Sequence, residues 1–343
     1  MSGALDSLNI VFPAPMQVAF AHDSVPPPGP GQLRCRARKS LVSRGTECFC
    51  LRGEYDPGTF WEDYVTFPFA PGYSMMAEVE SVGEGVAAFA PGQRVTTWGP
   101  HRQVFLVDQD KAFAVPDAIS DTDATWATLA RTTQLGVRRA GLELGESVGV
   151  IGLGILGQLV VQYLAIAGAR RIVAIDPAPG RLARAQRLGA THGIAASAAE
   201  ALPQVAALTG GQMLDVVFDI TGHPAVLAPA TQLLRQLGRL VLLGDSPTPS
   251  RQHLGPRVVG HSIAILGMHG FMFPQHATPF NQWTAAAMTE VFFDLLAQGR
   301  MNMAPLTDRL VSPLTALTLY PALLASEMTD EIGQIFDWTP LPA

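Results

Sequence analysis

The sequence predicts a two-domain α/β protein, in which a β-rich, barrel-like domain is joined to a doubly wound parallel sheet. The chain has 343 residues, which is more than one ordinary hydrophobic core accommodates. Up to about residue 125 it is rich in glycine, proline and short runs that alternate apolar and polar residues, as half-buried strands do. Beyond that point strand and helix patterns alternate at the length of parallel βαβ units.

The first domain is predicted from three alternating segments and the turns between them. The runs GQLRCRARKSLVS, AEVESVG and QVFLVDQDKAFAV place apolar residues at every second position, which predicts strands. The runs PPPGPG and FAPGQR separate them as turns.

The second domain is predicted from a regular alternation of strands and helices. ESVGVIG, RRIVAID, LDVVFDITG and GRLVLLGD are predicted strands. ILGQLVVQYLAIAGA, PGRLARAQRLGA and PAVLAPATQLLRQLG are predicted helices, the second of them with proline near its start and glycine at its end. After residue 271 this alternation ends, and a long helix around TAAAMTEVFFDLLAQG precedes further strands and a short helix.

Composition argues against several classes of protein. Hydrophobic residues make up 48% and charged residues 15%, so the chain can bury a large core. The formal net charge of −6 is spread without a basic block, which disfavours nucleic-acid binding. Neither a signal peptide nor an uncharged membrane-spanning run is recognised. Cys35, Cys48 and Cys50 form no disulfide framework, so we expect a soluble protein in the reducing cytoplasm.

A glycine-rich motif predicts a dinucleotide site. Gly152-Leu153-Gly154-Ile155-Leu156-Gly157 follows one predicted strand and opens a helix, as a loop that carries a pyrophosphate does. Asp176 ends the next strand, where a carboxylate accepts hydrogen bonds from ribose hydroxyls and repels a 2′-phosphate. The pattern therefore favours NAD(H), although Arg181 could instead pair with a phosphate, and a glycine turn without a ligand is the alternative. The expected cofactor-contacting residues are Gly152, Gly154, Ile155, Leu156, Gly157, Asp176, Pro177, Arg181, Thr221, Gly244 and His269.

The β-rich first half, followed by GESVGVIGLGILGQLVVQYLAIAGARRIVAID and GRLVLLG, resembles the medium-chain dehydrogenase/reductase superfamily over essentially the whole chain. The resemblance implies a GroES-like domain over residues 1–125, completed by residues 272–343, and a Rossmann NAD-binding domain over residues 126–271. It also implies a substrate cleft between the domains. A homodimer or homotetramer, with sheets extended across RVVGHSIAILG, is implied in the same way.

The chain departs from this family at the zinc site. In the zinc enzymes a cysteine stands two residues before a serine or threonine that is followed by an acid; these three positions hold Arg44, Thr46 and Glu47. Tyr73 stands at the position of the zinc histidine, and the run ATLARTTQ, near the third ligand position, has no cysteine or acid. The four cysteines of the family's structural zinc lobe are also missing after GQRV. We therefore expect no metal at either site.

The combination SRGTE, LRGEY, PGYS and GPHRQVFLV resembles the zinc-lacking branch that includes the bacteriochlorophyllide dehydrogenases. That resemblance implies oxidation or reduction at a secondary alcohol or ketone. Without zinc, fixed donors or a cation must stabilise the reacting oxygen. Thr46 is the expected hydrogen-bonding partner of that oxygen, Tyr73 and Arg44 are candidate donors beside it, and Glu47 is expected to pair with Arg44. The alternatives are an ion pair that only fixes the loop, packing by Tyr73, and a Thr46 hydroxyl bonded to its own backbone.

Histidines and a threonine-rich segment supply further candidates. His101 is a candidate proton shuttle, and His269 is expected to position cofactor or substrate. Residues 131–133, Arg-Thr-Thr, are expected to line the cleft or contact the nicotinamide end. The segment HGFMFPQHATPFNQW is expected either to wall an apolar substrate pocket or to pack between domains or subunits. Residues without an expected catalytic role are His223, His253, His276, Cys48 and Cys50.

The sequence therefore predicts an NAD(H)-dependent alcohol dehydrogenase or ketone reductase that acts without metal on a small molecule. Two alternatives stay open: a zinc-free reductase of carbon–carbon double bonds, and a non-catalytic NAD-binding sensor or scaffold. No nucleic-acid or membrane partner is expected.

Overall fold

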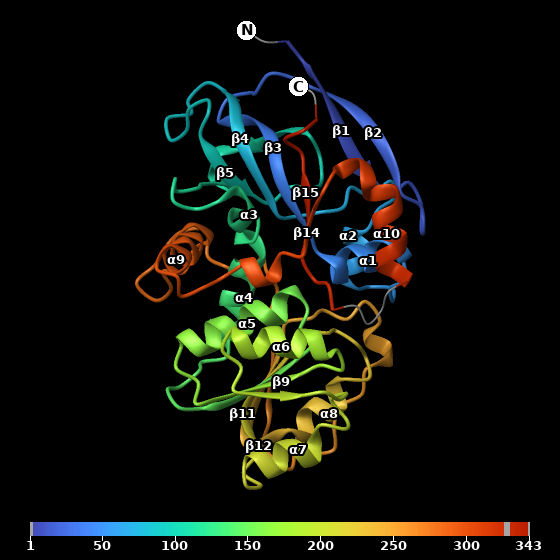
Figure 1. Cartoon of the computed structure of the whole chain (residues 1–343), viewed down its shortest axis with the longest axis vertical. Helices are drawn as coiled ribbons and strands as arrows, with labels where there is room; N and C mark the ends of the chain where they lie inside the picture. The colour runs from blue at the N-terminus through green and yellow to red at the C-terminus, as the bar shows by residue number, and fades with distance from the viewer. Residues whose placement is uncertain (1–2, 326–329, 342–343) are drawn as a thin grey trace.

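The computed structural model describes residues 3–325 and 330–341, which form a β-rich part and an α/β part (Figure 1). Both ends of the chain lie in the β-rich part, and the α/β part is built from the middle of the chain. This is the predicted fold class, and the two sheets described below confirm it.

The β-rich part contains a seven-stranded sheet in the order β14-β15-β3-β4-β5-β7, with β6 also paired to β3. Its last two strands come from the end of the chain, and β15 lies antiparallel to β3. A separate hairpin pairs β1 with β2. The strands of this part are β1 (Leu5–Val11), β2 (Ala19–Val25), β3 (Gln32–Val42), β4 (Met75–Val82), β5 (Arg94–Thr97), β6 (Val104–Asp108), β7 (Ala112–Ala114), β14 (Arg309–Val311) and β15 (Gln334–Asp337).

The α/β part contains six parallel strands in the order β10-β9-β8-β11-β12-β13. This is the strand order of a doubly wound nucleotide-binding sheet. The strands stay parallel, but the order in which the chain forms them reverses between β8 and β11. Val150 and Ile151, adjacent residues of β8, belong to different hydrophobic clusters, because successive side chains point to opposite faces. The strands are β8 (Ser147–Ile151), β9 (Arg171–Ile175), β10 (His192–Ile194), β11 (Leu214–Asp219), β12 (Leu234–Leu242) and β13 (Ala264–Gly267).

Helices cover the sheets and join the two parts. In the β-rich part and its connections they are α1 (Arg44–Arg52), α2 (Phe60–Tyr64), α3 (Asp121–Ala124), α9 (Ala285–Ala297) and α10 (Ala316–Ala325). In the α/β part they are α4 (Ala127–Arg139), α5 (Ile155–Ile166), α6 (Pro179–Arg187), α7 (Leu202–Leu208) and α8 (Leu227–Gln232). Among the helices of the described ranges, none has the length and apolar character that crossing a bilayer requires.

One predicted helix is much shorter than expected. The sequence predicts a helix over residues 224–238, but α8 ends at Gln232 and β12 begins at Leu234. Leu237 has a φ of 59°, a left-handed conformation that a helix interior does not accept. Leu234 pairs with Leu214 of β11, so the residues from Leu234 onward, which the apolar pattern assigns to the helix, belong to a strand.

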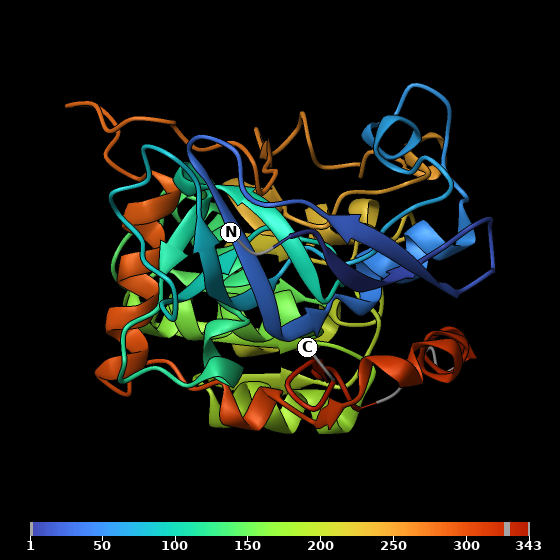
Figure 2. The same cartoon turned by 90° about the horizontal axis from the view of Figure 1, so that it is seen from above.

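The segment before α9 departs from the rest of the surface. Figure 2 shows this orange segment extending away from the β-rich part. Met272 is 70% exposed and Phe280 is fully exposed, so these two residues of the HGFMFPQHATPFNQW run are not buried packing.

Candidate active site

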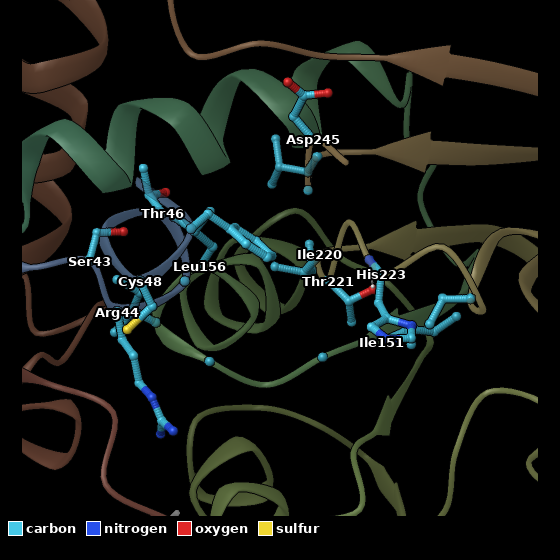
Figure 3. A pocket seen from close by; sticks show the side chains of 18 of the residues that line it. Ser43, Arg44, Thr46, Cys48, Ile151, Leu156, Ile220, Thr221, His223 and Asp245 are labelled. Carbon is cyan, nitrogen blue, oxygen red and sulfur yellow. Dashed lines mark hydrogen bonds between the residues drawn. The ribbon is translucent and has the colours of Figure 1, made fainter. Parts of the chain in front are cut away.

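A cavity of about 860 Å³ is lined by residues from both parts of the chain. From the sheet it takes residues at or just beyond the carboxyl ends of β8, β9, β11, β12 and β13, where doubly wound sheets bind ligands. From the β-rich part it takes residues of α1 and α2 together with Tyr73 and Trp98. Figure 3 shows part of this lining, with α1 seen end-on beside the loop around Thr221.

The glycine motif has the geometry that an approaching pyrophosphate needs. Gly152 has a φ of 89°, which favours glycine. A Cβ on Gly157 would lie 2.0 Å from the Gly152 carbonyl oxygen, so this glycine is required for helix–strand contact. A Cβ on Gly154, the residue before α5, would meet no protein atom within 4 Å. The loop is thus tight on its protein side and open on the other, as a dinucleotide site requires.

Asp176 lies at the next strand end and is tied to the glycine motif. Its Oδ2 accepts a hydrogen bond from the Leu153 amide at 2.8 Å, and its Oδ1 accepts one from the Ala178 amide at 2.8 Å. Arg181 Nη1 lies 3.7 Å from Oδ2. Asp176, Pro177 and Arg181 all line the cavity.

The loops after β11, β12 and β13 are closely packed, and they carry residues predicted to contact the cofactor. A Cβ on Gly244 would lie 2.4 Å from the Gly222 nitrogen. A Cβ on Gly270 would lie 2.6 Å from Thr132 Oγ1. Thr221 and His269 also line the cavity, so the structure gathers all the predicted cofactor residues except Gly157, which serves packing, around one cavity.

Only Thr132 of the predicted segment 131–133 lines the cavity. The Arg131 guanidinium is buried and lies 4.7 Å from the centre of the Phe113 ring. Thr133 Oγ1 donates to the carbonyl oxygens of Leu129 and Ala130, one turn earlier in α4. Because successive residues of a helix point in different directions, Arg131 and Thr133 face the protein core while Thr132 faces the cavity.

Three hydroxyl groups meet where the family places zinc. The Tyr73 hydroxyl lies 2.6 Å from Ser43 Oγ and 3.4 Å from Thr46 Oγ1, and all three side chains line the cavity. Burial raises the pKa of Tyr73 to about 12, although its hydrogen bonds with Ser43 and Thr46 act in the opposite direction. Tyr73 is therefore a neutral phenol at physiological pH. Ser43 was not predicted to be a site residue. It is the first residue of the SRGTE motif, and that position is the signal that could have indicated it.

Glu47 and His101 lie behind this hydroxyl cluster and do not line the cavity. Both are buried, with exposed fractions of 1% and 0%. The Glu47 carboxylate accepts a hydrogen bond from the Ser43 amide, contacts His101 Nε2 at 3.1 Å and accepts a hydrogen bond from the Tyr320 hydroxyl at 2.5 Å. His101 Nδ1 lies 2.7 Å from Ser40 Oγ. The pair therefore fixes the start of α1 from inside the β-rich part.

The expected pairing of Glu47 with Arg44 is wrong. Arg44 Nη2 donates to the Leu323 carbonyl at 2.9 Å, whereas Glu47 is occupied by the buried partners described above. Figure 3 shows the Arg44 side chain pointing away from Thr46. Because Glu47 follows Arg44 within α1 but faces the interior, sequence proximity did not bring the two charges together.

Aromatic rings form a continuous series on the substrate side of the cavity. The Tyr73 ring stacks on Trp98 with centroids 4.7 Å apart, and Trp98 lies 4.3 Å from Phe271. The Phe271 ring lies 5.1 Å from His269, which lies 4.7 Å from Phe60. The beginning of the HGFMFPQHATPFNQW segment thus walls the pocket, as one of the two alternatives predicted.

Two titratable groups face this aromatic side. Burial lowers the pKa of His269, and the nearby Asp245 carboxylate offsets only part of this effect. Burial likewise raises the pKa of Asp245, against the opposing influence of His269 and Trp61. Asp245 was not predicted, although an aspartate directly after the strand-ending Gly244 is a visible signal. His223, for which no role was predicted, also lines the cavity from the loop after β11.

Cys48 lines the cavity, but burial raises its pKa to about 11, so its thiol stays protonated and unreactive at neutral pH.

The residues at the zinc position do not fit a zinc ion. The Arg44 guanidinium offers no lone pair, and the Tyr73 phenol stays protonated. The helical run 127–134 supplies no cysteine, histidine or acid. Within residues 3–325 and 330–341, no group of three or more histidine, cysteine, aspartate or glutamate side chains is arranged to hold a metal.

Comparison with known proteins gives consistent matches. A family model described as zinc-binding dehydrogenase matches residues 156–287. The chain is 30% identical over 249 residues to the uncharacterised zinc-type alcohol dehydrogenase-like protein YphC of Escherichia coli (strain K12), covering 68% of this chain and 69% of that protein. It is 26% identical over 301 residues to D-guloside 3-dehydrogenase of the same organism, covering 82% and 85%.

Solved structures share the fold over nearly the whole chain. A protein of Sinorhizobium meliloti 1021 assigned as a zinc-binding dehydrogenase, bound to NADP, has a TM-score of 0.80 at 19% identity, covering 97% of this chain and 99% of that one. An alcohol dehydrogenase of Escherichia coli CFT073, complexed with NADH, has the same TM-score, identity and coverage. These likenesses establish the fold.

Proposed function

Because the chain belongs to the medium-chain dehydrogenase/reductase superfamily, among oxidoreductases of the zinc-type alcohol dehydrogenase kind, we propose that it interconverts a secondary alcohol and a ketone using NAD(H), without metal. The observation that carries this proposal is the cluster of Ser43, Thr46 and Tyr73 hydroxyls in the same cavity as the glycine motif.

The preference for NAD(H) rests on Asp176. Its carboxylate lies at the cavity wall and is held there by the Leu153 and Ala178 amides. A carboxylate so placed accepts hydrogen bonds from ribose hydroxyls and repels a 2′-phosphate. Arg181 is the nearby cation that would favour a phosphate, but it already lies 3.7 Å from Asp176. This supports NAD(H) over NADP(H).

The glycine motif, the strand ends around Thr221 and Gly244, and His269 would hold the cofactor. When bound, the nicotinamide donates or accepts the hydride. Thr46 and Tyr73 would bind the substrate oxygen and hold it in the polar corner of an otherwise aromatic pocket. The aromatic rings would exclude water from the remainder of the substrate.

Tyr73 acts as a neutral acid that relays a proton. In ketone reduction its O–H proton moves to the substrate oxygen, and the Ser43 O–H proton, 2.6 Å away, replaces it. Ser43 is then reprotonated from water in the cavity. Alcohol oxidation runs the same transfers backwards. Because the pKa of Tyr73 is raised to about 12, no free tyrosinate needs to form before the substrate binds.

The test combines a substrate panel with Tyr73→Phe. We expect ketones, and not enones, to oxidise NADH in the wild type. We expect Tyr73→Phe to lower kcat by about 100-fold or more, since it removes the proton donor. NADH affinity, measured by fluorescence, should change less than about twofold, because the cofactor residues are untouched.

Tyr55→Phe is the matched control. Its hydroxyl donates to the Val65 carbonyl and the side chain does not line the cavity, so kcat should be retained. An unchanged kcat in Tyr73→Phe would contradict the relay. Faster NADH oxidation by enones would favour a double-bond reductase, and NADH binding without any turnover would favour a sensor or scaffold.

A further inference from the structure

Asp245 brings a negative charge to the substrate side of the cavity. It follows Gly244, in the loop just beyond the end of β12 at Leu242, and the close approach of Gly244 to the Gly222 backbone fixes where that loop lies. Figure 3 shows Asp245 on a different segment from Thr46 of α1 and from Ser43, which directly precedes α1. Two separate parts of the chain thus present polar groups to one substrate.

The charge of Asp245 is not neutralised by a neighbouring side chain. Within the described residues, no lysine, arginine or histidine forms an ion pair with its carboxylate. His269 interacts with this carboxylate, but partial burial lowers the pKa of its imidazole below the ordinary value, which favours the neutral form at neutral pH. Three arginines of the described chain line the cavity, Arg44, Arg52 and Arg181, and none of them forms an ion pair with Asp245. Arg44 points away from Asp245 in Figure 3, and Arg181 lies beside Asp176.

Aromatic rings surround the same region. Phe60 and Phe271 lie 4.7 and 5.1 Å from the His269 ring. The Trp61 indole lies near enough to Asp245 to lower the pKa of that carboxyl, yet its N–H forms no well-aligned hydrogen bond. A carboxylate with no cationic partner beside aromatic rings is the combination that binds alkylammonium groups, through charge and cation–π attraction.

We propose, as a refinement that rests on the oxidoreductase function above, that Asp245 binds a protonated amine of the substrate and that the enzyme prefers amino alcohols and amino ketones. The reacting oxygen lies at Tyr73 and Thr46, while the amine lies against Asp245 and the Phe60 and Trp61 rings. Asp245 is then a residue that determines specificity and takes no part in proton transfer.

The test measures binding rather than turnover. Enzyme saturated with NADH is titrated by calorimetry with 2-amino-1-phenylethanol and with 1-phenylpropan-1-ol, in which a methyl group replaces the ammonium. The reduced nicotinamide ring carries no charge, so the comparison isolates the attraction between the substrate amine and the protein. The wild type should bind the amino alcohol about tenfold more tightly than its neutral analogue.

Asp245→Asn should abolish this difference by weakening amine binding about tenfold, with the neutral analogue affected less than about twofold. Asp63→Asn is the matched control, because Asp63 is an exposed carboxylate of α2 outside the cavity and should leave the difference intact. Equal affinity for the two ligands in the wild type, or an unchanged difference in Asp245→Asn, would overturn the proposal. Absence of hydride transfer to any ketone, with amine selectivity retained, would refute the proposed function alone.

Discussion

Ser43, Thr46 and Tyr73 show how a scaffold that lacks the three expected metal ligands can still present groups for carbonyl chemistry. Zinc would stabilise an alkoxide by charge, whereas a neutral phenol does so by donating a proton. The raised pKa of Tyr73 is compatible with this role, because the phenol keeps its proton throughout the physiological range. Glu47 and His101 contribute indirectly, by holding the beginning of α1 in place.

Asp176 offers a test of cofactor choice at the scale of one residue. Asp176→Asn keeps one side-chain acceptor, so it retains one of the two hydrogen bonds from the loop amides, and it removes the charge that repels a 2′-phosphate. Arg181 Nη1 lies 3.7 Å from the Asp176 carboxylate and so places a cation close to the same position. We expect the ratio of dissociation constants for NADPH and NADH to shift by about tenfold or more toward NADPH. Fluorescence titration with both cofactors measures this ratio, and a ratio equal to that of the wild type would count against the assignment.

Residues tied to a backbone motif could be predicted from the sequence, and residues that depend on three-dimensional packing could not. The glycine motif and Asp176 follow from local rules of strand, turn and helix. Positions 44 and 47 are close enough on a helix to pair, but Arg44 donates to the Leu323 carbonyl and the buried His101 and Tyr320 side chains hold Glu47. The position of Asp245 directly after Gly244 was a signal that was overlooked, and only the fold shows that Asp245 shares a cavity with Phe60 and Trp61.

At the scale of elements, most strands and helices of the α/β part followed from hydrophobic periodicity. The short elements β10 and α7 were not predicted, and the region of α8 and β12 was misassigned, because the run AVLAPATQLLRQL is apolar enough for either structure. Pairing of Leu234 with Leu214 and the left-handed φ of Leu237 decide in favour of a strand. Periodicity does not distinguish a buried strand from a helix over such a short run.

Arg184 of α6 pairs with Asp308, the residue before β14, and we expect this contact to stabilise the fold less at acidic pH. Burial raises the pKa of Asp308, but hydrogen bonds from Arg184 and from the Ile332 and Gly333 amides outweigh it and lower the pKa overall. The stabilisation is therefore present above the pKa of an unfolded aspartate and is lost as the pH falls through the lower pKa of the folded protein. Asp308→Asn should cost about 1–3 kcal/mol near neutral pH.

Denaturant unfolding at neutral and at acidic pH measures this contribution. The difference between wild type and Asp308→Asn should narrow at acidic pH, because the wild-type carboxyl is then protonated as well. Asp294→Asn, on the exposed face of α9, should stay within about 0.5 kcal/mol of the wild type at both pH values. A pH-independent difference for Asp308→Asn would show that its charge is not the cause.

At the scale of the whole molecule, the cavity depends on contributions from distant parts of the sequence. The strand ends of the α/β part present the cofactor side, and α1, α2 and the Tyr73 and Trp98 loops present the substrate side. Hydrogen bonds also link the two parts. The Asp56 amide donates to the Pro247 carbonyl, and the Ser250 amide donates to Asp56 Oδ2. A reaction in this cavity therefore requires both parts at once.

The central claim is hydride transfer without metal, and one experiment on one sample addresses it. Protein purified without chelator is analysed for zinc per subunit, and NADH-dependent ketone reduction is measured before and after treatment with a chelator. We predict far less than one zinc per subunit and a kcat that the chelator does not change, since the site lacks ligands for the ion. One zinc per subunit, with turnover that is lost on chelation and restored by added zinc, would contradict the account.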